Sequence, residues 1–203
     1  MEITLKRTAG IMAALLVLAA VTQAIYTVLY IGEVDINRKF LWSIEAVLFT
    51  ALTAFAGAAM MQAKRYALGW AAIVFASALN VVQVGVGLVM FAPFREVAQA
   101  VPEAAPAAGA IVAFSFFVYN AAKALLGLAA LVFGMAALTR AGARGAKALG
   151  GLTALVGVIA MTANALSMAL GRDFSGELPL AGGSGVLATV LLALVLTGAA
   201  GEE

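Results

Sequence analysis

A lysine stands near the middle of a long apolar segment. Lys123 lies within the 25 residues 114–138, of which 20 are apolar. A charge at the centre of a bilayer costs about 2.5–3.5 kcal/mol even on a lenient insertion scale. We therefore expect Lys123 to face the protein interior, where its ammonium group either pairs with an acceptor or anchors a ligand. Tyr119 and Asn120 precede it by about one helical turn.

Other apolar segments carry polar residues in pairs, three positions apart. The pairs are Asn80/Gln83, Asn120/Lys123, Asn164/Ser167, Gln23/Tyr26 and Trp42/Glu45. Residues three apart share one face of a helix, and a polar face is costly in lipid. We therefore expect these faces to turn toward one another. They predict one ligand-binding site, whose candidate residues are Lys123, Asn120, Glu45, Asn80, Gln83, Asn164, Tyr119 and Gln23.

Each candidate also has a purely structural interpretation. Amide side chains hydrogen-bond across membrane helices, on average with about 0.6 kcal/mol each. Asn80, Gln83 and Asn164 could therefore serve only to hold helices together. Glu45 lies near enough to the expected end of its segment to be a solvated residue of the first turns.

The expected partner of Lys123 is an oxygen acceptor, because an ammonium group in a low dielectric needs one to stay charged. Glu45 is the first choice, and the amide of Asn80 or Asn120 is the second. A direct bond to Glu45 would require a tilted helix around Lys123, since the two residues lie at different distances from the ends of their segments.

An aromatic run precedes the lysine and has two interpretations. Its members are Phe114, Phe116, Phe117 and Tyr119. Aromatic rings gather at membrane–water interfaces, so the run could form a belt that faces lipid. The same rings could instead line an apolar ligand cavity next to Lys123. Five glycines, at positions 85, 87, 127, 134 and 157, are expected at close contacts between helices.

The missing residue types exclude several kinds of chemistry. The chain has no histidine and no cysteine, so it lacks the usual haem and zinc ligands, a thiolate metal site and a disulfide. We predict no metal site and no catalytic residue, and the sequence identifies no cofactor. Enzyme chemistry would have to use Glu45, Lys123 or Tyr119, and we consider it the weakest hypothesis. The net charge of +2 is small and gives no indication of nucleic-acid binding.

The composition places these residues in a membrane protein. Of the 203 residues, 65% are hydrophobic and 11% charged, and the mean hydropathy is +1.08. Soluble domains are about half apolar and about a quarter charged. A lipid bilayer is therefore the expected environment of the chain.

Six apolar runs are long enough to cross a bilayer, which takes about 20 residues. They cover residues 8–30, 40–61, 67–91, 109–138, 149–170 and 185–200. Helices satisfy their own backbone groups in lipid, and the runs lack the alternation of barrel strands. We predict an all-α, polytopic integral membrane protein in which residues 1–203 form a single domain of six transmembrane helices in one bundle.

The basic residues between the runs predict the orientation. One side holds seven of them, Lys6, Arg7, Lys64, Arg65, Arg140, Arg144 and Lys147. The other side holds four, Arg38, Lys39, Arg95 and Arg172. Because cytoplasmic loops are richer in Lys and Arg, we expect both termini in the cytoplasm and the protein in the inner membrane of a bacterium. The candidate site then lies in the outer half of the bilayer.

The longer outer loop contains the sequence APFREVAQAVPEAAPAAG, residues 92–109. Phe94, Val97 and Val101 are spaced three and four apart, which is typical of a short amphipathic helix lying on a membrane. We predict such a helix from Pro93 to Val101, with a structured linker as the alternative.

Two functions fit these features. The first is a small-molecule-binding or transport-related membrane protein with a polar pocket in its outer half, for a small apolar or anionic ligand. The second is a non-catalytic accessory or assembly subunit of a larger complex, whose partners are membrane proteins. A cavity of about 300 Å³ or more, lined by the candidates, would favour the first, and a closed polar cluster would favour the second.

Overall fold

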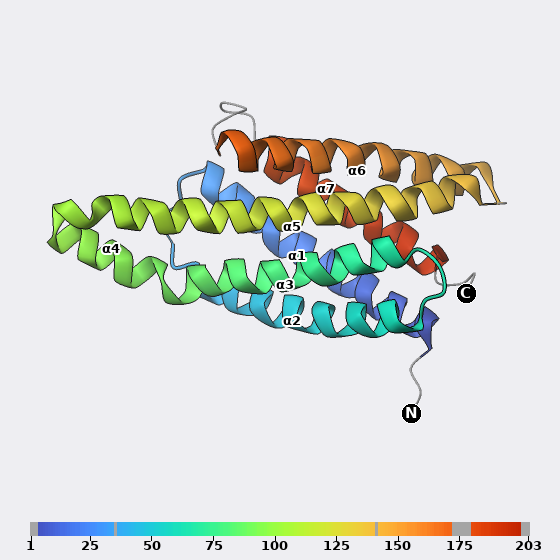
Figure 1. Cartoon of the computed structure of the whole chain (residues 1–203), viewed down its shortest axis with the longest axis horizontal. Coiled ribbons are helices and arrows are strands. Elements are labelled where there is room, and N and C mark those ends of the chain that lie inside the picture. The colour runs from blue at the N-terminus through green and yellow to red at the C-terminus, as the bar shows by residue number, and fades with distance from the viewer. Residues whose placement is uncertain (1–3, 35, 141, 172–179, 200–203) are drawn as a thin grey trace.

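The computed structural model describes residues 4–34, 36–140, 142–171 and 180–199 (Figure 1). The helices in these ranges are α1 (Leu5–Ile31), α2 (Lys39–Gln62), α3 (Ala67–Val89), α4 (Phe91–Ala100), the 3-10 turn η1 (Pro102–Ala104), α5 (Ala105–Thr139), α6 (Arg144–Leu170) and α7 (Leu180–Ala199). No strand occurs in them. Six of the helical segments are long and apolar enough to cross a membrane, which confirms the all-α fold class and the six-helix bundle. The two ends of the chain and Arg172, which entered the orientation argument, lie outside the described ranges.

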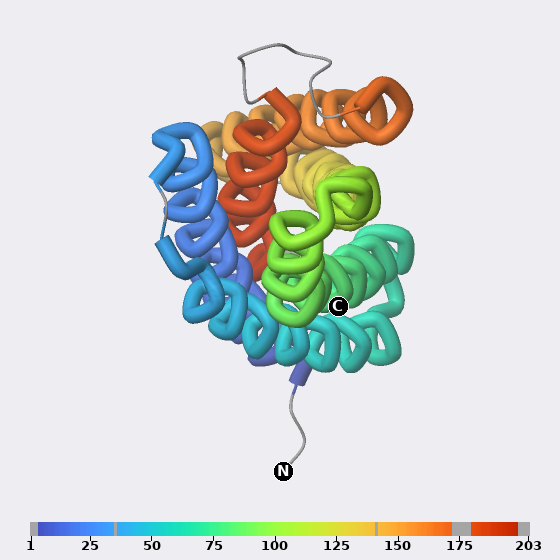
Figure 2. Tube along the Cα trace, turned by 90° about the vertical axis from the view of Figure 1, so that its left-hand side faces the viewer, coloured from blue at the N-terminus to red at the C-terminus, as the bar shows by residue number. Residues whose placement is uncertain are grey.

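The long helices run up and down along one axis (Figure 1). α1 begins and α7 ends at one end of the bundle, and α4 lies at the opposite end, called here the α4 end. α7 contacts α1, α5 and α6, and the view along the bundle shows it enclosed among them (Figure 2). α5 also packs against α3, so it contacts more of the bundle than any helix at the rim does.

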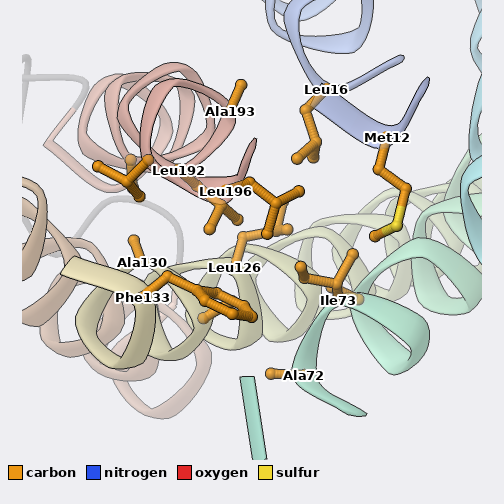
Figure 3. Packing of buried hydrophobic residues seen from close by; sticks show 14 of the residues in the cluster. Met12, Leu16, Ala72, Ile73, Leu126, Ala130, Phe133, Leu192, Ala193 and Leu196 are labelled. Carbon is orange, nitrogen blue, oxygen red and sulfur yellow. The ribbon is translucent and has the colours of Figure 1, made fainter. Parts of the chain in front are cut away.

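An apolar core joins α1, α3, α5 and α7 (Figure 3). Its buried side chains include Met12, Leu16, Ile73, Leu126, Phe133, Leu192 and Leu196. Lipid is as apolar as these side chains, so close van der Waals packing rather than exclusion of water holds the helices together.

Glycines bring α5 and α6 into backbone contact. A Cβ atom added at Gly134 would lie 2.5 Å from the backbone nitrogen of Ala154, and one added at Gly127 would lie 2.7 Å from that of Met161. Gly157 faces the backbone of α5 in the same way. The expectation of close packing is confirmed at these three positions and at Gly87, which packs on a tryptophan ring. It is wrong at position 85, where an added Cβ atom would meet no described atom within 4 Å.

α4 and the first turns of α5 form a helical hairpin that projects past the other helices (Figure 1). α5 has 35 residues and is about 52 Å long, whereas the hydrocarbon layer is about 30 Å thick. The helix expected over 93–101 is confirmed, with a start two residues earlier. It packs along α5, and none of its residues is buried. Contact between α4 and a membrane surface stays a prediction.

Candidate functional site

Lys123 is fully buried near the middle of α5. Its Nζ atom donates a hydrogen bond to Oε1 of Gln23 on α1 and lies 5.5 Å from the centroid of the Tyr119 ring. Its methylene groups pass close to α7, where a Cβ atom added at Gly185 would lie 2.8 Å from Cδ of the lysine. Three helices thus fix the position of one ammonium group.

The acceptor of Lys123 is not one of those predicted. Gln23 takes the place expected first for Glu45 and second for Asn80 or Asn120. Glu45 lies in the second turn of α2 and Lys123 near the middle of α5; the two groups interact electrostatically, while the ammonium group donates its hydrogen bond to Gln23. Gln23 was among the site candidates, but its depth on α1 relative to Lys123 could not be read from spacing alone.

Glu45 is buried, with 4% of its surface exposed, although it lies close to the start of α2. Its interpretation as a solvated residue is therefore wrong. Thr22 on α1 neighbours the carboxyl group, while the Thr22 hydroxyl donates to the carbonyl oxygen of Ala19 at 2.9 Å. The Oε1 atom of Glu45 is buried and has no hydrogen-bond partner among the described residues. A buried acceptor without a partner is destabilising by about 1–3 kcal/mol, and by more when it is charged.

A small, partly open cavity has Glu45 in its wall. Its volume is about 20 Å³, and its walls are Gln23, Tyr26, Trp42, Glu45, Gln83 and Tyr119. The space suits one water-sized group and is far smaller than the roughly 300 Å³ of an ordinary ligand pocket. The cavity brings four of the eight candidates together, contributed by α1, α2, α3 and α5.

Two lining residues, Tyr26 and Trp42, belong to the spaced polar pairs but were left out of the predicted site. Their ring centroids are 6.2 Å apart. The Arg38 guanidinium lies 5.3 Å from the centroid of the Tyr26 ring and donates to the carbonyl oxygen of Val34 at 3.1 Å. Arg38 therefore holds the loop after α1 against the aromatic wall of the cavity.

The position of Trp42 is set by α3 and α4. A Cβ atom added at Gly87 on α3 would lie 3.1 Å from the Trp42 ring. Phe91, the first residue of α4, packs edge-on against the same ring at 5.5 Å between centroids. Gly87 on α3 and Phe91 on α4 together fix the position of the Trp42 ring in the cavity wall.

Ser115 is a site residue that the sequence argument missed. It is buried, and its Oγ accepts a hydrogen bond of 3.4 Å from Nε2 of the lining residue Gln83. A signal was present, because Ser115, Tyr119 and Lys123 follow one another at intervals of four and so share a face of α5.

Three predicted candidates, Asn80, Asn120 and Asn164, are buried but do not line the cavity. Asn164 donates from Nδ2 to the carbonyl oxygens of Ala160, at 2.8 Å, and Ala181, at 3.1 Å. It thereby ties α6 to the start of α7, as the structural interpretation expects. Asn80 donates to the carbonyl oxygen of Ala76 within its own helix at 3.0 Å.

The four rings of the aromatic run differ in their surroundings. Phe114 and Phe117 are 49% and 48% exposed on the outside of the bundle, as a lipid-facing belt requires. Phe116 packs against Tyr30 with centroids 6.0 Å apart, and Tyr119 lines the cavity. Two rings of the run are therefore exposed, and of its four members Tyr119 lines the cavity.

The comparisons with known proteins give no family for this chain. No protein-family model, no curated protein and no solved structure matches it. The described residues contain no group of three or more acidic side chains that could hold a metal ion. The chemistry of the cavity walls is therefore the basis for any functional argument.

Proposed function

We propose that this integral membrane protein binds a small polar molecule in the cavity at the α4 end of its bundle and takes part in its transport. The observation that supports this most is the buried carboxyl group of Glu45, which lines the cavity and whose Oε1 atom has no hydrogen-bond partner in the described chain. A carboxyl group kept for structure alone would be expected to have its acceptors satisfied. A ligand in the cavity would supply the missing hydrogen bond.

The surroundings of Lys123 add to this argument. Its ammonium group bonds to the neutral amide of Gln23 and lies over the Tyr119 ring. Two buried charges in one bundle would stabilise it most simply by pairing. Lys123 and Glu45 interact electrostatically, but the hydrogen bond of the ammonium group goes to Gln23, and Oε1 of Glu45 has no described donor.

The location belongs to the same proposal. We place the protein in a bacterial inner membrane with both termini in the cytoplasm and the α4 end outside, because the basic residues are denser at the opposite end. The cavity then opens in the outer half of the bilayer, where a solute from the periplasm would enter it.

The test is recovery of the bound molecule. The full chain is purified in mild detergent from its native host, and its small molecules are identified by mass spectrometry. A molecule is expected with the wild type and with Glu103→Gln, which alters an exposed carboxylate in η1. The same molecule should be lost with Glu45→Gln. A folded wild-type protein that carries no enriched small molecule would contradict the proposal.

A second function, an accessory or assembly subunit of a larger membrane complex, is favoured by the small volume of the cavity. At about 20 Å³ it resembles a hydrated polar cluster more than a ligand pocket. This function predicts a stoichiometric protein partner in the same purification. It also predicts that the protein partner stays bound to Glu45→Gln. Under this function Glu45 binds no ligand, and its buried side chain does not contact the partner.

A further inference from the structure

We propose that Glu45 is a proton-binding site, whose carboxyl group takes up and releases a proton through water in the adjoining cavity. The proton is then a second ligand of the site described above. The inference rests on the proposed function only for the part that the proton plays in transport, because proton binding can be measured without the transported molecule.

The hydrogen bonds around Glu45 match a carboxylic acid. The hydroxyl group of Thr22 interacts with the carboxyl group, but its single proton goes to the carbonyl oxygen of Ala19 at 2.9 Å. Thr22 therefore offers Glu45 a lone pair rather than a proton. A carboxylate can only accept hydrogen bonds, whereas a carboxylic acid has an O–H group that donates to such a lone pair. This neighbour on α1 thus suits the protonated form.

Burial favours the protonated form as well. Only 4% of the surface of Glu45 is exposed, and its Oε1 atom has no described donor. The ammonium group of Lys123 donates its hydrogen bond to Gln23 rather than to the carboxyl group. A buried carboxylate that lacks donors is strongly disfavoured, and a neutral carboxyl group loses much less by the same burial.

Lys123 makes release of the proton possible. Its positive charge attracts the carboxylate and so opposes the effect of burial. Tyr26 on α1 and Tyr119 on α5 also act on Glu45, but tyrosines are neutral at ordinary pH. The lining residue from α3 is the uncharged Gln83. Burial and Lys123 therefore act in opposite directions, and both states of the carboxyl group can form.

The cavity supplies the route for the proton. It has Glu45 in its wall, is partly open and has a volume of about 20 Å³, which is room for one water molecule. On release, the O–H bond of the carboxylic acid breaks, the proton passes to the water, and the electron pair stays on the carboxylate oxygen. Ionisable side chains inside membrane bundles commonly serve as proton relays in this way.

The test is infrared spectroscopy of the full chain in a maltoside detergent, which contains no carbonyl group. Spectra are recorded over a series of pH values in H₂O and in D₂O. A protonated carboxyl group gives a carbonyl stretching band that moves to lower frequency in D₂O. We expect such a band at neutral pH, where exposed carboxyl groups are ionised, and we expect it to disappear at alkaline pH.

Variants assign the band. Glu45→Gln should remove it, while Glu103→Gln, which alters an exposed carboxylate, should leave it unchanged. Lys123→Met removes the charge that attracts the carboxylate, so the band should persist to a pH about one unit higher or more. Because Lys123→Met retains Glu45, it also tests the proposal if Glu45→Gln does not fold. Thr22→Val removes the acceptor of the acid and should move the band to higher frequency, whereas Thr22→Ser should leave it in place.

The outcomes separate the proton site from the function on which it rests. The site is overturned if folded protein shows no band that depends on Glu45 or Lys123, or if the band persists until the protein unfolds at alkaline pH. A band that does not move in D₂O would also overturn it, because water would then not reach the carboxyl group. A native-host purification without an enriched small molecule would instead contradict the proposed function and leave the proton site standing.

Discussion

The stem of Lys123 fits between α1 and α7 only because position 185 has no side chain. We expect Gly185→Ala to place a methyl group 2.8 Å from Cδ of Lys123, which forces the lysine to move and overpacks the interface. The expected destabilisation is about 1–3 kcal/mol, seen as a lower midpoint of thermal unfolding in detergent. Gly85→Ala is the control, because its Cβ atom would meet no described atom within 4 Å. Equal midpoints for the two variants would show that the lysine stem does not depend on Gly185.

The unpartnered carboxyl group of Glu45 predicts a conflict between stability and binding. Without ligand, Glu45→Gln should leave the midpoint of thermal unfolding unchanged or raise it, because the change removes a buried charge whose Oε1 has no described partner. Sites arranged for binding commonly lower stability in this way. A clear fall in the midpoint of the ligand-free protein would instead show that Glu45 stabilises the bundle.

At the scale of the helices, the contact between α5 and α6 is the least tolerant of change. Gly134→Ala would bring a Cβ atom within 2.5 Å of the backbone of Ala154, and backbone atoms cannot move aside as a flexible side chain can. We expect separation of the two helices and a loss of about 3 kcal/mol or more. The yield of monodisperse protein in size-exclusion chromatography measures it. Gly57→Ala, a change in α2 with no described atom within 4 Å of the new Cβ, should behave like the wild type.

The helices themselves could be predicted because a bilayer imposes the length and polarity of each span. The depth of each residue could not, because it depends on where a helix begins relative to its neighbours. α5 begins at Ala105, and its position against α1 gives the hydrogen bond of Lys123 to Gln23 rather than to Glu45, although the two charged groups still interact electrostatically. The rotation of each helix about its own axis could not be predicted from the sequence either. Asn164 lies on the polar face predicted for its segment. Its side chain nevertheless donates to carbonyl oxygens of α6 and α7 and does not line the cavity.

At the scale of the whole molecule, the orientation in the membrane can be tested cleanly because the chain has no cysteine. Glu103→Cys lies in η1 at the α4 end, and Ala146→Cys lies at the start of α6, near the opposite end; both positions are exposed. A membrane-impermeant maleimide should label Glu103→Cys in intact cells and Ala146→Cys only after permeabilisation. The reverse pattern would contradict the orientation given by the basic residues.

The backbone contact between α5 and α6 also determines which parts of the molecule can move. The two backbones approach so closely at Gly127, Gly134 and Gly157 that we expect α5 and α6 to move together as one body. Any widening of the cavity then requires displacement of α1, α2 or α3 relative to that body. The hydrogen bond between Lys123 and Gln23 crosses the boundary between the two parts. It therefore ties α1 to that body, and a displacement of α1 away from α5 has to break it.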